Sequence, residues 1–215
     1  DMKFFASLML ALAFLSGPIS NVQARDARTV KVVKKKTVHT HRHAKPHRRH
    51  PAPRARAARM VALKSSAVLI LDPKTKVVLY GKNAKAVMPI ASLTKLMTAM
   101  VVLEARQDMA EMLTVTDADV DRLKYSSSRL HVGTRLSRSA MLHIALMSSE
   151  NRAASALGRN YPGGTKAFVA AMNAKARALG MRRTHYVEPT GLSSANVSTP
   201  EDLARLVVAA ERHAL

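Results

Sequence analysis

Residues 25–60 set the first limit on how this 215-residue chain can fold. The stretch holds thirteen lysines and arginines, five of the nine histidines and a single acid, Asp26, with no apolar periodicity. So charged a segment cannot bury enough apolar surface to offset the entropy lost on ordering, and its three prolines favour extended conformations. We therefore predict that residues 25–62 are a basic, histidine- and proline-rich disordered linker. Any folded domain then lies in residues 63–215.

An apolar run at residues 4–15 precedes this linker, behind Lys3 and ahead of the helix-breaking pair Gly17-Pro18. Small residues suited to signal peptidase follow and end at Ala24. The run is far shorter than the ~20 residues that a membrane-spanning helix needs. We therefore predict a cleaved secretory signal peptide at residues 1–24, in preference to a membrane anchor, and a periplasmic or secreted mature protein.

The charge of the chain predicts an anionic partner. The formal net charge of the chain is +21. A basic tail such as residues 25–60 attracts nucleic acid, anionic lipid and anionic envelope polymers alike. Because export places the tail in the cell envelope, we expect anionic envelope polymers as its partner and no nucleic acid. The histidines from His39 to His43 are surrounded by cations and lack carboxylates, which favours a solvated tether over a metal site. The absence of cysteine excludes disulfides, thiol catalysis and thiolate metal sites.

The remaining residues alternate short apolar runs with helical patterns. Residues 67–71 and 77–80 are apolar and flank the turn-forming sequence DPKTK, which predicts a β-hairpin covered on both faces. Pro89 favours entry into a helix. Within that helix, apolar residues recur at the spacing that forms one buried stripe: Leu93, Leu96, Met97, Met100 and Val101.

Further helices are predicted from their caps. Ser137 is an N-cap candidate for one helix, Thr165 for another that Gly180 ends, and Thr199 for a last helix with Pro200 at its first position. Residues 125–128 (YSSS) form a polar loop, which we interpret as a connection rather than the border of a site. Residues 148–152 (SSENR) join two helices, either as a simple capping junction or as a turn that projects hydroxyl and amide groups inward.

Ser92 and Lys95 form an S-x-x-K tetrad at the start of the first helical run. Residues three apart share one helix face, so the Ser92 hydroxyl and the Lys95 amine come within hydrogen-bond reach. A lysine takes the proton of a serine only when its amine is neutral, which requires burial or a nearby cation. About one such tetrad is expected by chance in a chain rich in both residues, so an exposed pair on the first turn stays an alternative.

The motifs taken in order resemble the penicillin-recognising serine peptidases. Three strings, at residues 91–98 (ASLTKLMT), 146–153 (LMSSENRA) and 188–192 (EPTGL), are similar to those of the D-alanyl-D-alanine endopeptidase branch of the low-molecular-mass penicillin-binding proteins. The resemblance runs from about Ser65 to Leu215. It implies an α/β (α+β) fold of the β-lactamase/transpeptidase type. In that fold a helical cluster packs against an antiparallel sheet, of which this chain holds only the N-terminal hairpin.

The resemblance also implies roles for four residues. Ser92 would be the acylated nucleophile, Lys95 its base, Ser149 a proton relay to the leaving amine, and Asn151 the group that holds substrate and Lys95 in place. The implied reaction is acyl transfer from a D-alanyl peptide carbonyl, followed by hydrolysis of the acyl-enzyme, with no metal or cofactor. The implied partners are peptidoglycan peptide stems, and β-lactam antibiotics as covalent inhibitors. Glu150 receives no catalytic role.

One motif of that family, K-T-G on a later strand, does not follow Leu192. In the family its strand supplies a cation beside the base lysine and one N–H of the oxyanion hole, and loss of one such donor costs ~10² to 10³ in rate. We therefore expect the sequence to be a C-terminally truncated piece of a longer enzyme. The alternatives are a D-alanyl-D-alanine carboxypeptidase and a non-catalytic cell-wall-binding module. A class A β-lactamase is disfavoured because no E-x-x-L-N segment is present.

Overall fold

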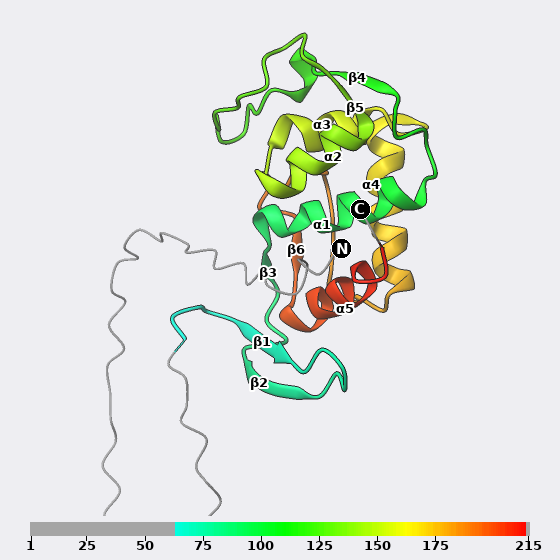
Figure 1. The fold of residues 1–215 in the computed structure, drawn as a ribbon. Coiled ribbons are helices and arrows are strands. Elements are labelled where there is room, and N and C mark those ends of the chain that lie inside the picture. The colour runs from blue at the N-terminus through cyan, green and yellow to red at the C-terminus, as the bar shows by residue number, and fades with distance from the viewer. Residues whose placement is uncertain (1–62, 214–215) are drawn as a thin grey trace, which may run out of the picture. The chain divides into compact units, whose positions relative to one another are not determined.

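The computed structural model describes residues 63–213, so the signal peptide and the basic linker predicted for residues 1–62 lie outside the described part. Five α-helices, two 3₁₀ turns and six short strands follow one another in this part (Figure 1). In chain order they are β1 (Val68–Leu71), β2 (Val78–Lys82), β3 (Met88–Pro89), η2 (Ala91–Leu93), α1 (Thr94–Glu104), β4 (Met112–Thr114), η3 (Asp117–Asp119), β5 (Arg135–Ser137), α2 (Arg138–Met147), α3 (Asn151–Arg159), α4 (Gly164–Ala178), β6 (Val197–Ser198) and α5 (Pro200–Ala210).

The strands pair in three separate two-stranded antiparallel sheets, β1 with β2, β3 with β6 and β4 with β5. The combination of a helical cluster with antiparallel strands agrees with the predicted α/β (α+β) class. No helix among residues 63–213 combines the length and the apolar character needed to cross a membrane.

Helix α1 is the central element, because α2, α3, α4 and α5 all pack against it (Figure 1). The predicted stripe is correct for Met97, Met100 and Val101, which are buried, but the helix also buries most of its other sides. Leu93 is wrong as a core residue, since it lies in the 3₁₀ turn before the helix and is 40% exposed. A single stripe is expected for a helix with one neighbouring layer, whereas α1 is surrounded by helices.

Pro89 does not begin this helix. It lies in β3, where Pro89 pairs with Val197 of β6, and the chain turns into η2 two residues later. A proline is tolerated in a short edge ladder because one missing N–H interrupts few hydrogen bonds. The position of the helix start was therefore predicted a few residues too early.

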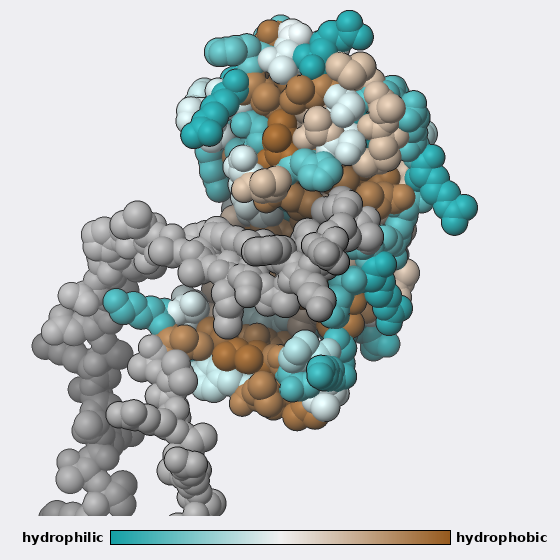
Figure 2. Space-filling model, viewed as in Figure 1, coloured by the Kyte–Doolittle hydropathy of each residue, from teal (hydrophilic) through white to brown (hydrophobic). Residues whose placement is uncertain are grey.

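The hairpin of β1 and β2 forms as predicted. Its turn is closed by Asp72, whose carboxylate accepts hydrogen bonds from the backbone N–H of Lys74 at 3.0 Å and of Thr75 at 2.6 Å. The expectation of two covered faces is wrong among the described residues, where Val78 and Leu79 are 57% and 63% exposed. Apolar side chains gather on the surface of this hairpin (Figure 2). Of the described elements, α5 is the main one packed against β1, which leaves most of the ladder uncovered.

Two predicted caps are confirmed and one is wrong. Ser137 accepts a hydrogen bond from Ala140 N and begins α2, and Thr199 accepts one from Asp202 N and begins α5. Helix α4 instead begins at Gly164 after Gly163, whose φ of 85° lies in the left-handed region, and Thr165 has no capping role. The two glycines turn the backbone into the helix before Thr165 is reached.

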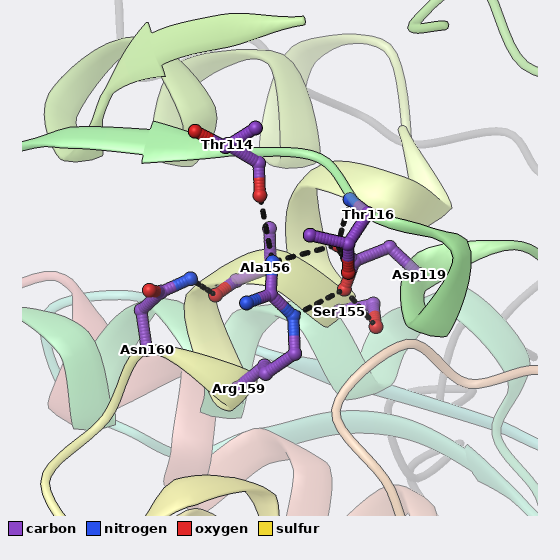
Figure 3. A network of polar contacts seen from close by, with 7 residues as sticks. All are labelled: Thr114, Thr116, Asp119, Ser155, Ala156, Arg159 and Asn160. Atoms are coloured by element: carbon purple, nitrogen blue, oxygen red, sulfur yellow. Dashed lines mark hydrogen bonds and ion pairs between the residues drawn. The ribbon is translucent and has the colours of Figure 1, made fainter. Parts of the chain in front are cut away.

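A buried carboxylate joins the segment after β4 to helix α3 (Figure 3). Asp119 is 4% exposed and accepts hydrogen bonds from Arg159 Nη2 at 2.8 Å and Ser155 Oγ at 2.8 Å. The same arginine donates to the carbonyl of Thr114 at 2.7 Å, and Thr116 N donates to Asp119 at 2.8 Å. The network therefore ties the 3₁₀ turn η3 to the middle and the last residue of α3, the helix that begins with Asn151.

Candidate active site

The amine of Lys95 is the meeting point of the site. Lys95 is only 3% exposed, and its Nζ donates to Asn151 Oδ1 at 2.8 Å and to the Thr190 carbonyl at 2.7 Å. Ser92 Oγ lies 3.4 Å from the same Nζ, a long hydrogen bond. The alternative of an exposed pair on a first helical turn is therefore wrong. The fold places the half-buried nucleophile candidate beside its buried base candidate.

Burial lowers the pKa of Lys95 from 10.5 to about 8, while the negative charges of Glu188 and Glu150 act in the opposite direction. Desolvation disfavours the ammonium form, because a charge loses more solvation than a neutral amine does. A neutral amine is therefore accessible near neutral pH. Lys95 thus meets the condition for a base lysine, which is burial that allows its amine to be neutral.

Ser149 reaches Ser92 from the junction between α2 and α3. Its Oγ donates to Ser92 Oγ at 2.8 Å. Ser149 has a φ of 54°, in the left-handed region that residues other than glycine rarely adopt. The junction directs the exposed hydroxyl of Ser149 to Ser92 and the amide of Asn151 to Lys95. Its capping residue is Glu150, whose carboxylate accepts from Arg152 N at 3.1 Å. Ser149 and Asn151 are thus free of the capping role that their residue types favour.

Residues 188–192, the EPTGL string, form a turn that makes one wall of the site. The Glu188 carboxylate holds it from within, accepting from Gly191 N at 2.7 Å and from Asn196 Nδ2 at 2.8 Å. Asn196 Nδ2 also donates to Thr94 Oγ1 at 3.1 Å, which ties the turn to α1 beside Lys95. The turn therefore delivers the Thr190 carbonyl to Lys95. No sequence signal marks this contact, because every residue carries a carbonyl.

Gly191 lies against the backbone that precedes the nucleophile candidate. A Cβ built on Gly191 would meet Ala91 O at 1.9 Å and Ser92 N at 3.0 Å. Gly191 itself has a φ of 87°, and Ala91 has a φ of 45°. The close approach and the left-handed backbone both require glycine at this position. The glycine of the EPTGL string thus leaves room for the backbone of Ala91 and Ser92, and in this way it helps to position Ser92.

Ser126 belongs to the site, so the interpretation of residues 125–128 as a mere connection is wrong. Asn151 Nδ2 donates to Ser126 Oγ at 3.0 Å, and Ser126 Oγ donates to Asp121 at 2.6 Å. The hydroxyl-rich composition of the loop was the available signal, but composition alone does not say which hydroxyl turns inward. Within residues 63–213, no three histidine or acidic side chains come together to hold a metal ion.

Comparisons with known proteins place these motifs in one family. A family model described as D-alanyl-D-alanine carboxypeptidase matches residues 53–215. A D-alanyl-D-alanine endopeptidase of Pseudomonas aeruginosa is 52% identical over 165 residues, covering 77% of this chain and 53% of the relative. One of Escherichia coli is 48% identical over 161 residues, covering 75% of this chain and 52% of the relative. The chain thus spans about half the length of the curated relatives it matches.

Solved structures show the same fold. A Streptomyces DD-transpeptidase superposes with a TM-score of 0.63 at 30% identity, over 69% of this chain and 62% of that one. A penicillin-binding protein of Listeria monocytogenes in its ampicillin-bound form gives a TM-score of 0.59 at 33% identity, over 70% of this chain and 62% of that one. Because the family model covers well over half of its residues, the chain belongs to the D-alanyl-D-alanine carboxypeptidase family.

Proposed function

We propose that the protein is a serine peptidase that cleaves D-alanyl peptide cross-links of peptidoglycan through an acyl-enzyme on Ser92. The observation that carries the proposal is the buried amine of Lys95, 3.4 Å from Ser92 Oγ and with its pKa lowered to about 8. A base of this kind is what a serine hydroxyl needs in order to attack a carbonyl near neutral pH. About 50% identity to relatives named endopeptidases supports the choice of the cross-link as substrate.

In the proposed reaction, neutral Lys95 takes the proton of Ser92 as Oγ bonds to the D-alanyl carbonyl carbon. Ser149, whose hydroxyl contacts Ser92 Oγ at 2.8 Å, relays the proton held by Lys95 to the departing amine as the peptide bond breaks, which leaves Lys95 neutral again. A water molecule then hydrolyses the ester on Ser92 and releases the carboxylate product. Asn151 holds Lys95 through its Oδ1. The contacts among Ser92, Lys95, Ser149 and Asn151 that support this sequence of steps are present in the site.

A fluorescent penicillin tests the nucleophile. We expect the protein expressed from its natural gene to be labelled covalently, and the Ser92→Ala variant to remain unlabelled. Ser148→Ala serves as the matched control, because Ser148 is exposed and lies beside the motif without contacting Ser92. Label that persists in Ser92→Ala would assign the ester to another residue. An unlabelled parent that still binds isolated wall sacculi would favour a non-catalytic wall-binding module.

The second candidate is D-alanyl-D-alanine carboxypeptidase activity, which the description of the matching family favours. The two reactions share the acyl-enzyme and differ in the leaving group, a cross-linked peptide in one and free D-alanine in the other. Digestion of purified cross-linked muropeptides separates them. The endopeptidase converts cross-linked dimers to monomers, whereas a carboxypeptidase releases D-alanine and leaves the dimers intact.

The place of action is part of the proposal. Peptidoglycan lies outside the cytoplasm, so we propose export through the signal peptide predicted at residues 1–24, and anionic envelope polymers as partners of the basic residues 25–60. The support is the sequence pattern and the charge, +12 in residues 25–60. N-terminal sequencing of the protein recovered from the envelope tests export, and an intact N-terminus in the cytoplasm would contradict it.

A further inference from the structure

The side-chain amide of Asn151 has to face Lys95 with its oxygen. Its two ends are alike in size, and they point to two partners, Oδ1 to Lys95 Nζ at 2.8 Å and Nδ2 to Ser126 Oγ at 3.0 Å. With the amide turned over, two donors would oppose each other when Lys95 is protonated. Something in the site therefore has to fix which end of the amide lies where.

Asp121 is the group that can only accept hydrogen bonds, and it lies at the end of this series of contacts. It is 8% exposed, and its carboxylate accepts from the backbone N–H of Leu123 at 2.8 Å, Lys124 at 3.0 Å and Ser126 at 2.8 Å. Burial opposes ionisation, but the hydrogen bonds from Lys124, Ser126 and Leu123 outweigh it and hold the pKa of Asp121 well below its usual range. The carboxylate is therefore ionised at physiological pH and acts only as an acceptor.

Ser126 lies between Asp121 and Asn151 and determines which end of the Asn151 amide faces it. A hydroxyl has one hydrogen, and that of Ser126 is given to Asp121 at 2.6 Å. Only acceptor capacity then remains on Ser126 Oγ, so the neighbouring group on Asn151 must be the donor, Nδ2. Oδ1 is left to face Lys95. The donor and the acceptor of each hydrogen bond from Asp121 through Ser126 and Asn151 to Lys95 are thereby fixed.

The loop backbone is bent to allow these contacts. Tyr125, next to Ser126, has a φ of 52°, a conformation that costs free energy in a residue with a side chain. The bend brings both the N–H and the hydroxyl of Ser126 onto the same carboxylate oxygen of Asp121. Upstream, the buried Asp119 network ties the start of this segment to α3, the helix that carries Asn151 (Figure 3).

We propose that Asp121 and Ser126 are positioning residues that fix the orientation of the Asn151 amide toward Lys95. The proposal rests on the proposed acyl transfer for its effect on rate, but its effect on Lys95 exists without catalysis. Two charged groups act on the pKa of Lys95, Glu188 of the 188–192 turn and Glu150 at the start of α3. Both stay in place when Ser126 is altered.

Ser126→Ala is the decisive variant, because it removes the hydroxyl and keeps the N–H bond to Asp121. We expect penicillin acylation to slow about tenfold, the size of one lost hydrogen bond. Without this acceptor the amide can also turn over when Lys95 is neutral, which favours the neutral form, so we expect the pKa of Lys95 to fall by roughly half a unit to one unit. The acid limb of the acylation profile then moves to lower pH by the same amount.

Matched variants separate positioning from folding. Ser127→Ala removes a neighbouring exposed hydroxyl that makes no hydrogen bond among the described residues, and we expect the parent rate and pH limb. Ser126→Thr restores a hydroxyl and should recover both. Asp121→Asn, which can also donate to Ser126, should shift the limb in the same direction as Ser126→Ala. Thermal unfolding of each variant reports loss of stability separately.

Titration of Lys95 by NMR of its ε-carbon provides a readout that needs no acylation. A lower pKa of Lys95 in Ser126→Ala than in Ser127→Ala supports the positioning role. This holds even if penicillin never labels the parent protein, a result that would contradict only the proposed function. An unchanged pKa of Lys95 in Ser126→Ala overturns the positioning role. A loss of thermal stability with an unchanged pKa does the same, because it reduces Ser126 to a structural contact.

Discussion

The left-handed backbone at Ala91 and Ser149 places the hydroxyl groups of Ser92 and Ser149. Ala91 precedes Ser92, and Ser149 is itself in this conformation, with φ values of 45° and 54°. Residues other than glycine adopt this region only where the surroundings hold them there. At Ala91 the neighbour is Gly191, and at Ser149 it is the start of α3, where Glu150 caps the helix. The local strain thus brings Ser149 Oγ within 2.8 Å of Ser92 Oγ.

The pH dependence of acylation follows from Lys95. Its amine is mostly protonated below a pKa of about 8, and the neutral fraction falls about tenfold for each further unit of pH. We therefore expect the acylation rate of the parent protein to rise with pH and to level off above about 8. Stopped-flow measurements with a chromogenic β-lactam check this profile. A limb near 10, the value for an exposed lysine, would show that burial does not set the pKa.

Gly191→Ala tests the close approach to Ala91. The new Cβ would lie 1.9 Å from the Ala91 carbonyl oxygen, so the 188–192 turn must move and the Thr190 carbonyl must leave Lys95. We expect a loss of about 4 kcal/mol or more in the free energy of unfolding, the range of the most damaging substitutions. Urea unfolding, followed by circular dichroism, measures this loss.

Gly133→Ala is the control for backbone conformation alone. Gly133 also has a positive φ, 91°, but nothing lies within 4 Å of a Cβ built on it. The cost of the left-handed conformation by itself is about 1–2 kcal/mol. Equal losses in the two variants would contradict the role assigned to the contact between Gly191 and Ala91.

At the scale of elements, α1 and α3 carry the site and their neighbours hold them in place. Helix α1 presents Lys95 from its first turn, and α3 presents Asn151 from its first residue. Gly158 of α3 packs tightly against the 188–192 turn, since a Cβ there would meet Pro189 Cγ at 2.9 Å. The two helices and the turn therefore form one packed unit around the Lys95 amine.

Asp119→Ala tests the connection between the segment after β4 and α3. The change leaves Arg159 and Ser155 without their buried partner, and Arg159 is itself partly exposed, which lets water compensate in part. We expect a loss of about 2–3 kcal/mol in the free energy of unfolding, below the 3–5 typical of fully buried pairs. The matched change Asp117→Ala, at an exposed acid of the same 3₁₀ turn, should stay within about 0.5 kcal/mol. Similar losses in both would place the effect in the turn rather than in the ion pair.

At the scale of the whole molecule, the densest positive charge and the candidate site lie in different parts of the chain. Residues 25–60 carry a net charge of +12, whereas the chemistry resides in contacts among residues 92–196. Interactions between solvent-exposed charges act over a Debye length and weaken with salt, whereas a buried site is screened little. Polyanion binding and acylation should therefore respond independently to mutation.

Replacement of Lys34, Lys35 and Lys36 by glutamine tests this separation. We expect weaker binding to a soluble polyanion such as polyglutamate, with the slope of log affinity against log salt reduced by about two to three. Penicillin acylation should be unchanged. The control removes the same charge from dispersed exposed positions of the folded part, Lys74, Lys85 and Lys166, and should reduce the slope less. Equal slopes would show that net charge, and not the basic segment, governs polyanion binding.

The sequence determined the elements whose signals are local. The caps Ser137 and Thr199, the glycine that ends α4 and the hairpin turn at Asp72 each act within a few residues, so their patterns sufficed. The motif strings also brought out Ser92, Lys95, Ser149 and Asn151, which the fold gathers at one place. Thr165 and Pro89 failed because a glycine pair and a strand pairing competed with the local preference and won.

Only the tertiary structure decided what surrounds Lys95. The Thr190 carbonyl arrives from 95 positions away, and a carbonyl has no sequence signature. Ser126 was one of three neighbouring serines, and the bend at Tyr125 with the acceptor Asp121 selected it for the site. Gly191 was one letter of a motif string, and only packing set it against Ala91. Residue types give the chemistry that is available, whereas the pKa of a lysine and the direction of an amide depend on burial and partners that folding alone provides.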